Sequence, residues 1–303
     1  MSRPVEGLKS EALLVALKDA MQGTPARLEE LLARHGGLPG PKPNVKLAAA
    51  FGSEVAAMPG KIAQLLTRLG DNDAAPDTAQ AFLPVAAAHG WAHRLRENHD
   101  VELAWRGLMV LAADERGPVR VGTLDALVNL SLREGGVDVL IQRALGWLDE
   151  DDRELRFGAA ALVIEALGDA RLLAAVRDHD ALLTYLASAI DRVADAPRSA
   201  ERSEGRRRVL TSLALALASV VALVRAGDRG LSWFEAECTR AKHPDVRFAL
   251  SQALLKLQNI PQAPSATLVD QLREKLVDSA KPLRDPSRVR PGTGRGRRSR
   301  NTR

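Results

Sequence analysis

The chain has 303 residues, of which 46% are hydrophobic and 27% are charged, as is usual for a folded globular protein. Aromatic residues make up only 3% of the chain while alanine and leucine are abundant, which favours closely packed helices over strands. A single cysteine, Cys238, excludes an intramolecular disulfide framework and a cysteine-rich zinc site, so we expect a reducing, cytoplasmic location.

Residues 1–97 predict an N-terminal helical region, either irregular or capping repeats or a separate small element. The segments "PVEGLKSEALLVALKDAMQG" and "TPARLEELLARHGG" are amphipathic and predict a helix pair. Thr24 is the expected N-cap of the second helix, with Pro25 at its first position and Gly36 at its end. The segment "GGLPGPKPN" then predicts a rigid turn.

The segment "HGWAHRLRENHD" is the one local cluster that suggests metal chemistry. On a helix, His89, His93 and Glu97 would share a face at four-residue intervals, a spacing found among metal ligands. Three ligands spread along one helix span more than a single ion reaches, and the sequence offers no obvious further ligand. We therefore interpret the cluster as a polar helix face and predict no metal site.

One helical pattern recurs through the chain and is clearest in "HPDVRFALSQALLKL", residues 243–257. Its apolar stripe comprises Val246, Ala249, Leu250, Ala253, Leu254 and Leu257. Related segments carry a basic residue in the same slot, at positions 46, 120, 156, 207 and 247. A recurrence of about 35 to 50 residues leaves room for two helices per unit and is typical of an α-solenoid. The small residues Gly122, Gly158 and Ala249 would let neighbouring helices approach closely.

Three of these segments resemble the second helix of HEAT repeats: "PVRVGTLDALVNL", "ELRFGAAALVIEA" and "DVRFALSQALLKL". They share an aliphatic residue followed by arginine and a small residue two positions later. The resemblance covers residues 98–260 and implies stacked antiparallel helix pairs whose second helices line a concave, partner-binding face. We assign HEAT-like repeats to residues 98–280. The repeated Arg120, Arg156 and Arg247 would either contact a protein partner there or join neighbouring repeats by hydrogen bonds and ion pairs.

A branch of HEAT-like proteins excises alkylated bases from DNA, and the resemblance implies tryptophans that cradle a nucleotide beside an aspartate. Trp105 near Asp100, or Trp147 before Asp149, could be placed in that role. No family motif matches either position, so we predict no catalytic residue. We interpret all four tryptophans as core residues: Trp91, Trp105, Trp147 and Trp233.

Residues 195–224 combine a polar loop with the longest uncharged run of the chain. The loop "DAPRSAERSEG", residues 195–205, is expected to be solvated. The run "VLTSLALALASVVALV" that follows is shorter than the roughly 18 to 20 residues of a bilayer span. We therefore predict a buried helix and no membrane span.

The net charge of +5 is concentrated in the last residues. Residues 281–303 contain nine Lys or Arg against one Asp, so residues 1–280 carry a net charge of −3. This tail lacks an apolar stripe, which predicts a disordered polycation able to bind phosphates with little sequence preference. The expected polyanion-binding residues are Arg288, Arg290, Arg295, Arg297, Arg298, Arg300 and Arg303.

These patterns predict an all-α, HEAT-like solenoid with a basic tail that acts as a non-enzymatic scaffold or adaptor for a protein partner, without a cofactor. The alternative is a nucleic-acid-binding protein that acts through the tail or as an alkylated-base DNA glycosylase. A face that grips DNA should be basic, and the acidic net charge of residues 1–280 favours the adaptor. The partner's identity and the oligomeric state do not follow from the sequence.

Overall fold

The computed structural model describes residues 10–56, 58–59, 61–223, 229–259 and 265–277. Within these residues every regular element is a helix, which confirms the all-α prediction. The α-helices are α1 (Ser10–Met21), α2 (Ala26–His35), α3 (Val45–Ala56), α4 (Ile62–Gly70), α5 (Phe82–Arg96), α6 (Val101–Ala112), α7 (Gly117–Ser131), α8 (Gly136–Trp147), α9 (Arg153–Leu167), α10 (Ala170–Ala175), α11 (His179–Ala194), α12 (Glu204–Leu223), α13 (Arg229–Arg240), α14 (Pro244–Leu257) and α15 (Ala266–Val277). None of these described helices combines the length and apolar character that a bilayer span requires.

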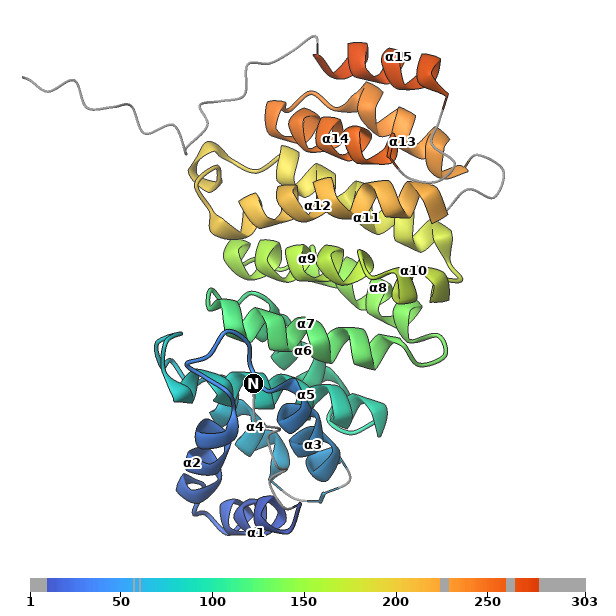
Figure 1. The fold of residues 1–303 in the computed structure, drawn as a ribbon. Coiled ribbons are helices and arrows are strands. Elements are labelled where there is room, and N and C mark those ends of the chain that lie inside the picture. Colours follow the sequence, from blue (N-terminus) through green and yellow to red (C-terminus); the bar gives the residue numbers. More distant parts are fainter. Residues whose placement is uncertain (1–9, 57, 60, 224–228, 260–264, 278–303) are drawn as a thin grey trace, which may run out of the picture.

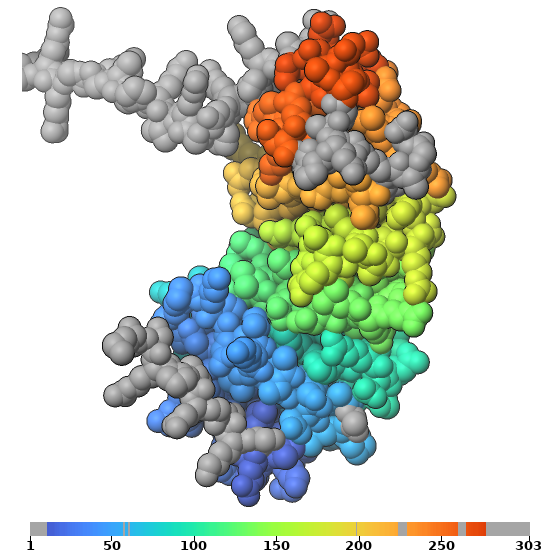
Figure 2. Space-filling view, turned by 45° about the vertical axis from the view of Figure 1, so that its right-hand side comes forward, coloured from blue at the N-terminus to red at the C-terminus, as the bar shows by residue number. Residues whose placement is uncertain are grey.

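From α3 onward the helices form two rows (Figure 1). The inner row consists of α3, α5, α7, α9, α12 and α14, each of which packs against the next. The outer row consists of α4, α6, α8, α11, α13 and α15, and the chain alternates between the rows, with the short α10 inserted before α11. Figure 2 shows this stack bent into a crescent that is hollowed along its inner row.

Helices of the stack begin where the sequence places acidic residues and prolines. The side chain of Asp152 accepts hydrogen bonds from the first backbone amides of α9, and Asp178 does the same for α11. Pro118 and Pro244 occupy the first turns of α7 and α14, where a missing amide costs no helical hydrogen bond.

The N-terminal helix pair is present, but its second helix starts differently from the prediction. The Thr24 hydroxyl donates a hydrogen bond to the carbonyl of Asp19 instead of capping α2, which begins at Ala26. Gly36 ends α2 as expected. The pair α1–α2 lies at one end of the stack, where α2 packs against α5 and α1 against α4 (Figure 1).

The expected boundary at residue 97 lies in the turn between α5 and α6. Packing is continuous across it, because α5 contacts α3 before the boundary and both α6 and α7 after it. Residues 45–96 therefore contribute helices to the same two rows as the later segments. The assignment of HEAT-like repeats to residues 98–280 stays a prediction.

The recurring small residues lie where neighbouring helices come closest. A Cβ atom at Gly122 would lie 2.4 Å from the Val85 side chain of α5, and one at Gly158 would lie 2.6 Å from the Cα atom of Ala113. Gly205 of α12 faces α9 at a similar close approach, next to the backbone nitrogen of Gly158. The expectation that small residues permit close helix packing is confirmed at Gly122 and Gly158.

Ion pairs join successive helices of the outer row. Most are largely exposed, so each stabilises the fold by at most about 1 kcal/mol. Their partners lie about one repeat apart in sequence, which ties each layer to the next. The pairs are Glu102–Arg143, Asp149–Arg192, Asp180–Arg229, Asp191–Arg240 and Glu235–Lys275.

The loop of residues 195–205, expected to be solvated, is partly packed onto α9. Ala200 and Ser203 are buried, and the Ser203 hydroxyl donates a 2.8 Å hydrogen bond to the carboxylate of Glu154. Arg153 also donates to the hydroxyl of Ser199. The prediction holds for the exposed Asp195, Pro197, Ser199 and Arg202. It is wrong for Ala200 and Ser203, because the loop crosses the start of α9, where these small residues find packing partners.

Gly158→Ala tests the close approach of α9 to Ala113, which follows the outer helix α6. The added methyl group would meet the backbone of Ala113, so we expect a loss of roughly 1 to 3 kcal/mol in the free energy of unfolding. Urea denaturation of the full chain measures this loss. Gly146→Ala is the matched control, because no atom lies within 4 Å of its added Cβ and alanine favours the helix. Equal stability of the two variants would contradict the packing described above.

Candidate partner-binding surface

The repeated arginines of the sequence pattern donate hydrogen bonds to backbone carbonyls. Arg120 reaches the carbonyls of Asp114 and Glu115, and Arg156 reaches that of Glu150 at 2.9 Å. In both cases the accepting loop joins an outer helix to the inner helix that carries the arginine. Arg247 instead donates to the carbonyl of Lys275, in the last outer helix. Of the three arginines, Arg247 forms the expected link to the next layer, whereas Arg120 and Arg156 bond a loop of their own layer. Contact of these arginines with a partner stays a prediction.

The inner surfaces of α12 and α14 expose apolar side chains that sequence reasoning missed. Leu215 is 53% exposed, Phe248 54% and Leu255 46%, although each lies on a helix that is otherwise well packed. Soluble proteins expose single apolar residues often, but several on adjacent helices are typical of an interaction site. The sequence offered one indication of their exposure: these apolar residues lie outside the helical stripe of buried positions on α12 and α14.

Exposed positions follow a four-residue spacing along α12. They are Arg207, Thr211, Leu215, Ser219 and Leu223. Because α12 packs against α9, α13 and α14 on its other sides, this exposed stripe faces the hollow of the crescent. On α14, Phe248 and Leu255 lie two turns apart on the adjacent helix. We call this set of seven residues the α12–α14 surface.

Arg208 borders the α12–α14 surface with an incompletely bonded guanidinium group. One of its nitrogens, Nη2, is buried and has no hydrogen-bond partner. Burial lowers the pKa of Arg208, and the neighbouring charge of Arg120 lowers it further, while Glu165 and Glu204 act in the opposite direction. A buried donor without an acceptor is costly, and this cost lies inside the fold, because Nη2 has no exposed surface for a partner.

The histidine cluster of α5 does not form a metal site. The ring of His89 is buried, and its Nε2 atom has no hydrogen-bond partner and lies 3.6 Å from a carboxylate oxygen of Asp125. His93 is half-buried, whereas Glu97 lies beyond the end of α5 and is exposed. Among the described residues no group of three His, Cys, Asp or Glu side chains is placed to hold an ion.

Three of the four tryptophans are core residues, as predicted. Trp91, Trp105 and Trp147 are each at most 8% exposed, and the rings of Trp105 and Trp147 meet edge to face with centroids 6.1 Å apart. Asp100, considered above as a partner of Trp105, forms an ion pair with Arg94 at 2.6 Å. Trp233 differs, because it packs against the core but is only half-buried.

The predicted polyanion-binding arginines of the tail, Arg288 to Arg303, lie outside the described residues. Their role stays a prediction from the sequence. Comparison with known proteins adds no assignment to the geometry above: no family model, no curated protein and no solved structure matches this chain.

The buried His89 predicts a specific dependence of stability on pH. Burial, followed by the charges of His93 and Arg96, lowers the pKa of His89 from 6.5 to about 4. As the pH falls, the His89 imidazole takes up a proton in the unfolded chain before it does so in the folded chain, which favours unfolding. The free energy of unfolding is therefore highest above about pH 6.5 and falls toward pH 4. Between pH 7.5 and pH 5.0, the full chain should lose about 2 kcal/mol more unfolding free energy than a His89→Gln variant does.

Urea denaturation at the two pH values measures that difference. A His35→Gln variant is the matched control, because His35 is exposed at the end of α2 and should leave the pH dependence of the full chain in place. Equal losses in the wild type and in His89→Gln would show that His89 is not held neutral by burial.

Proposed function

We propose that the chain is a non-enzymatic HEAT-like α-solenoid that acts as an adaptor and binds a protein partner on its inner row. The observation that carries this proposal is the exposure of Leu215, Phe248 and Leu255 on two adjacent helices that face the hollow of the crescent. Large apolar side chains on a concave surface are typical of sites where a partner segment is buried.

The order of contacts supports the solenoid part of the proposal. Each inner helix packs against the inner helices before and after it, and the outer helices intervene in the chain between them. Such nearest-neighbour packing is typical of repeat arrays, whose terminal units need a polar outer face. Helix α15 agrees with that requirement, because its buried residues Val269, Leu272 and Leu276 form one stripe and most of its other described positions are exposed.

The charges around the α12–α14 surface favour an acidic partner. Arg207 and Arg208 follow one another at the start of its stripe, and the pairing of Arg207 with Glu204 leaves Arg208 without an ion pair among the described residues. An amphipathic helix with apolar anchors at turn spacing and flanking carboxylates would satisfy both features. The partner would thus bury Leu215 and Phe248 and place a carboxylate beside Arg208.

Nucleic-acid binding through the tail is the second candidate, and the nine Lys or Arg of residues 281–303 favour it. A polycation binds DNA or RNA by displacing counterions, so its affinity falls steeply with salt. This activity is compatible with an adaptor role, because the tail and the inner row are separate parts of the chain. Glycosylase activity has no comparable support from the described tryptophans, three of which are buried in the core.

A double substitution of Leu215→Glu and Phe248→Glu tests the adaptor proposal. Both side chains are more than half exposed, so the fold should persist while the apolar contact is lost. Quantitative affinity purification with full-length baits should recover a partner with wild-type protein and lose it at least about tenfold with the double variant. The purified partner is then titrated against both baits by calorimetry.

Val139→Glu is the matched control, because Val139 is 43% exposed on the outer helix α8. Retention of the partner by this control and its loss by the double variant are the expected results. A partner held equally by all three baits would contradict binding on the α12–α14 surface.

The tail is tested in the full chain by replacing the seven arginines from Arg288 to Arg303 with glutamine. Titration of labelled double-stranded DNA at two salt concentrations should show binding by the wild type that weakens with salt and is largely lost in the variant. Unchanged DNA binding by the variant would place the nucleic-acid contact on residues 1–287 and would count against the seven arginines.

A further inference from the structure

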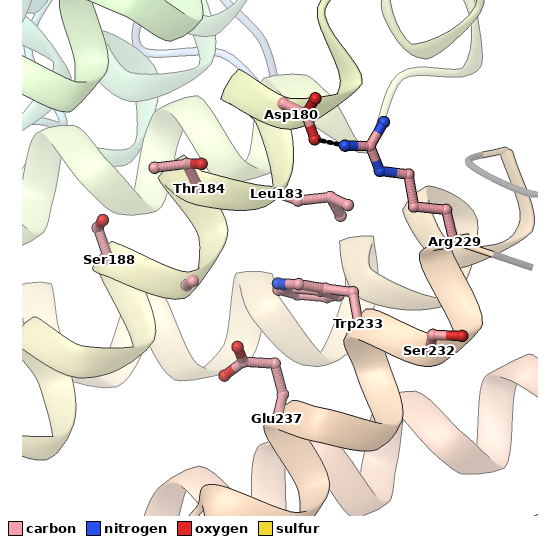
Figure 3. Close-up of a pocket in the computed structure, with 9 residues that line it drawn as sticks. Asp180, Leu183, Thr184, Ser188, Arg229, Ser232, Trp233 and Glu237 are labelled. Atoms are coloured by element: carbon pink, nitrogen blue, oxygen red, sulfur yellow. Dashed lines mark hydrogen bonds and ion pairs between the residues drawn. The ribbon is translucent and has the colours of Figure 1, made fainter.

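A cavity of about 920 Å³ lies between α11 and α13, on the outer row and therefore on the opposite side of the stack from the α12–α14 surface (Figure 3). Helix α11 contributes one carboxylate, two hydroxyl groups and apolar side chains to its wall, and α13 contributes an indole, a carboxylate and a guanidinium group. The principal lining residues are Asp180, Leu183, Thr184, Ser188, Arg229, Trp233 and Glu237.

Trp233 provides an aromatic wall to this cavity. Figure 3 shows its indole projecting from α13 toward α11, with Leu183 above the ring and the carboxylate of Glu237 below it. Trp233 is also the one half-buried tryptophan of the chain, since the other three belong to the core. A tryptophan face beside a carboxylate is a favourable environment for a cation, because the ring quadrupole and the negative charge act together.

Glu237 is a buried carboxylate with one oxygen left for a ligand. Its side chain is only 5% exposed, and Arg240 approaches the single oxygen Oε2, at 2.7 Å from Nε and 2.6 Å from Nη2. Among the described residues no donor reaches the other oxygen, Oε1. Burial raises the pKa of this carboxyl group, although Arg240 opposes the rise. A second cation that donates to Oε1 would offset the cost of burying the charge.

The mouth of the cavity is closed on one side by an ion pair between the two helices. Arg229 of α13 bonds to Asp180 of α11, so the guanidinium group at the mouth is already neutralised (Figure 3). Glu237 is then the carboxylate of the wall whose counter-ion, Arg240, lies outside the lining and bonds its Oε2 oxygen. The hydroxyl groups of Thr184 and Ser188 add acceptors on the α11 side.

We infer that this cavity binds the guanidinium group of an arginine side chain, presented by a flexible basic segment of a partner protein. The group stacks on the indole of Trp233 and donates to Oε1 of Glu237. A guanidinium group fits better than an ammonium group, because it is planar, stacks on aromatic rings and spreads its donors in one plane. This site is independent of the acidic partner proposed for the inner row, so either can fail alone.

Calorimetric titration of the full chain with the peptide acetyl-Gly-Ser-Arg-Gly-Ser-amide tests the inference. The same peptide with citrulline in place of arginine keeps the shape and removes the charge, and it should bind about tenfold more weakly or worse. Glu237→Gln should weaken binding of the arginine peptide by a similar factor. Trp233→Leu should weaken it about threefold or more, because the aromatic face is lost while an apolar wall remains.

Glu235→Gln is the matched control, since Glu235 lies on the same helix, is 45% exposed, pairs with Lys275 and does not line the cavity. Its affinity should stay within about twofold of the wild type. Thermal melting checks whether each variant is folded. If Glu237→Gln does not fold, the binding of the arginine peptide to Trp233→Leu decides the outcome. Equal binding of the arginine and citrulline peptides, or equal losses in Glu235→Gln and Glu237→Gln, would overturn the inference. Equal affinity for free L-arginine would assign the cavity to the free amino acid and overturn the peptide assignment.

Discussion

The two-row stack depends on how closely its inner helices approach one another. At Gly122 of α7 the Val85 side chain of α5 leaves no room for a methyl group, and a Cβ atom at Gly205 of α12 would lie 3.0 Å from the backbone nitrogen of Gly158 in α9. Close approach lets the stripes of neighbouring inner helices interlock, and dispersion and apolar burial both grow with that contact. Because each layer is too thin to bury its own apolar face, this contact between layers is what stabilises every helix in the stack.

Buried arginines complete the joints between layers. Arg94 donates to the carbonyls of Ala56 and Met58 at the end of α3, although it belongs to α5. Arg206 of α12 is 1% exposed and donates to the carbonyl of Val193 and to the carboxylate of Asp245 in α14. The last carbonyls of a helix have no partner within it, and a guanidinium group from another helix supplies one. Removal of such a buried partner typically costs 3 to 5 kcal/mol, so these side chains fix the order of the layers.

The two faces of the stack differ in chemistry for a geometric reason. On the inner row the helices pack tightly, and what remains exposed is a shallow stripe of apolar and basic side chains along α12 and α14. On the outer row the small side chains of α11 leave an open cavity against α13. A stripe with apolar anchors suits a helical segment, whereas a buried carboxylate beside Trp233 suits a single cationic group. The proposed adaptor would thus contact partners of opposite charge on its two faces.

The sequence by itself determined the helices and their approximate register. The apolar stripe of residues 246–257 is buried throughout, and the small residues at Gly122 and Gly158 lie at close helix contacts, because helical periodicity and side-chain size are local properties. Only the tertiary structure decided which groups remain available for function. Arg120 and Arg156 donate to nearby carbonyls, while Leu215, Phe248 and Trp233 retain exposed surface. Exposure depends on the layers before and after each helix, whose residues lie about 40 positions away in the sequence, and no local pattern encodes what those layers cover.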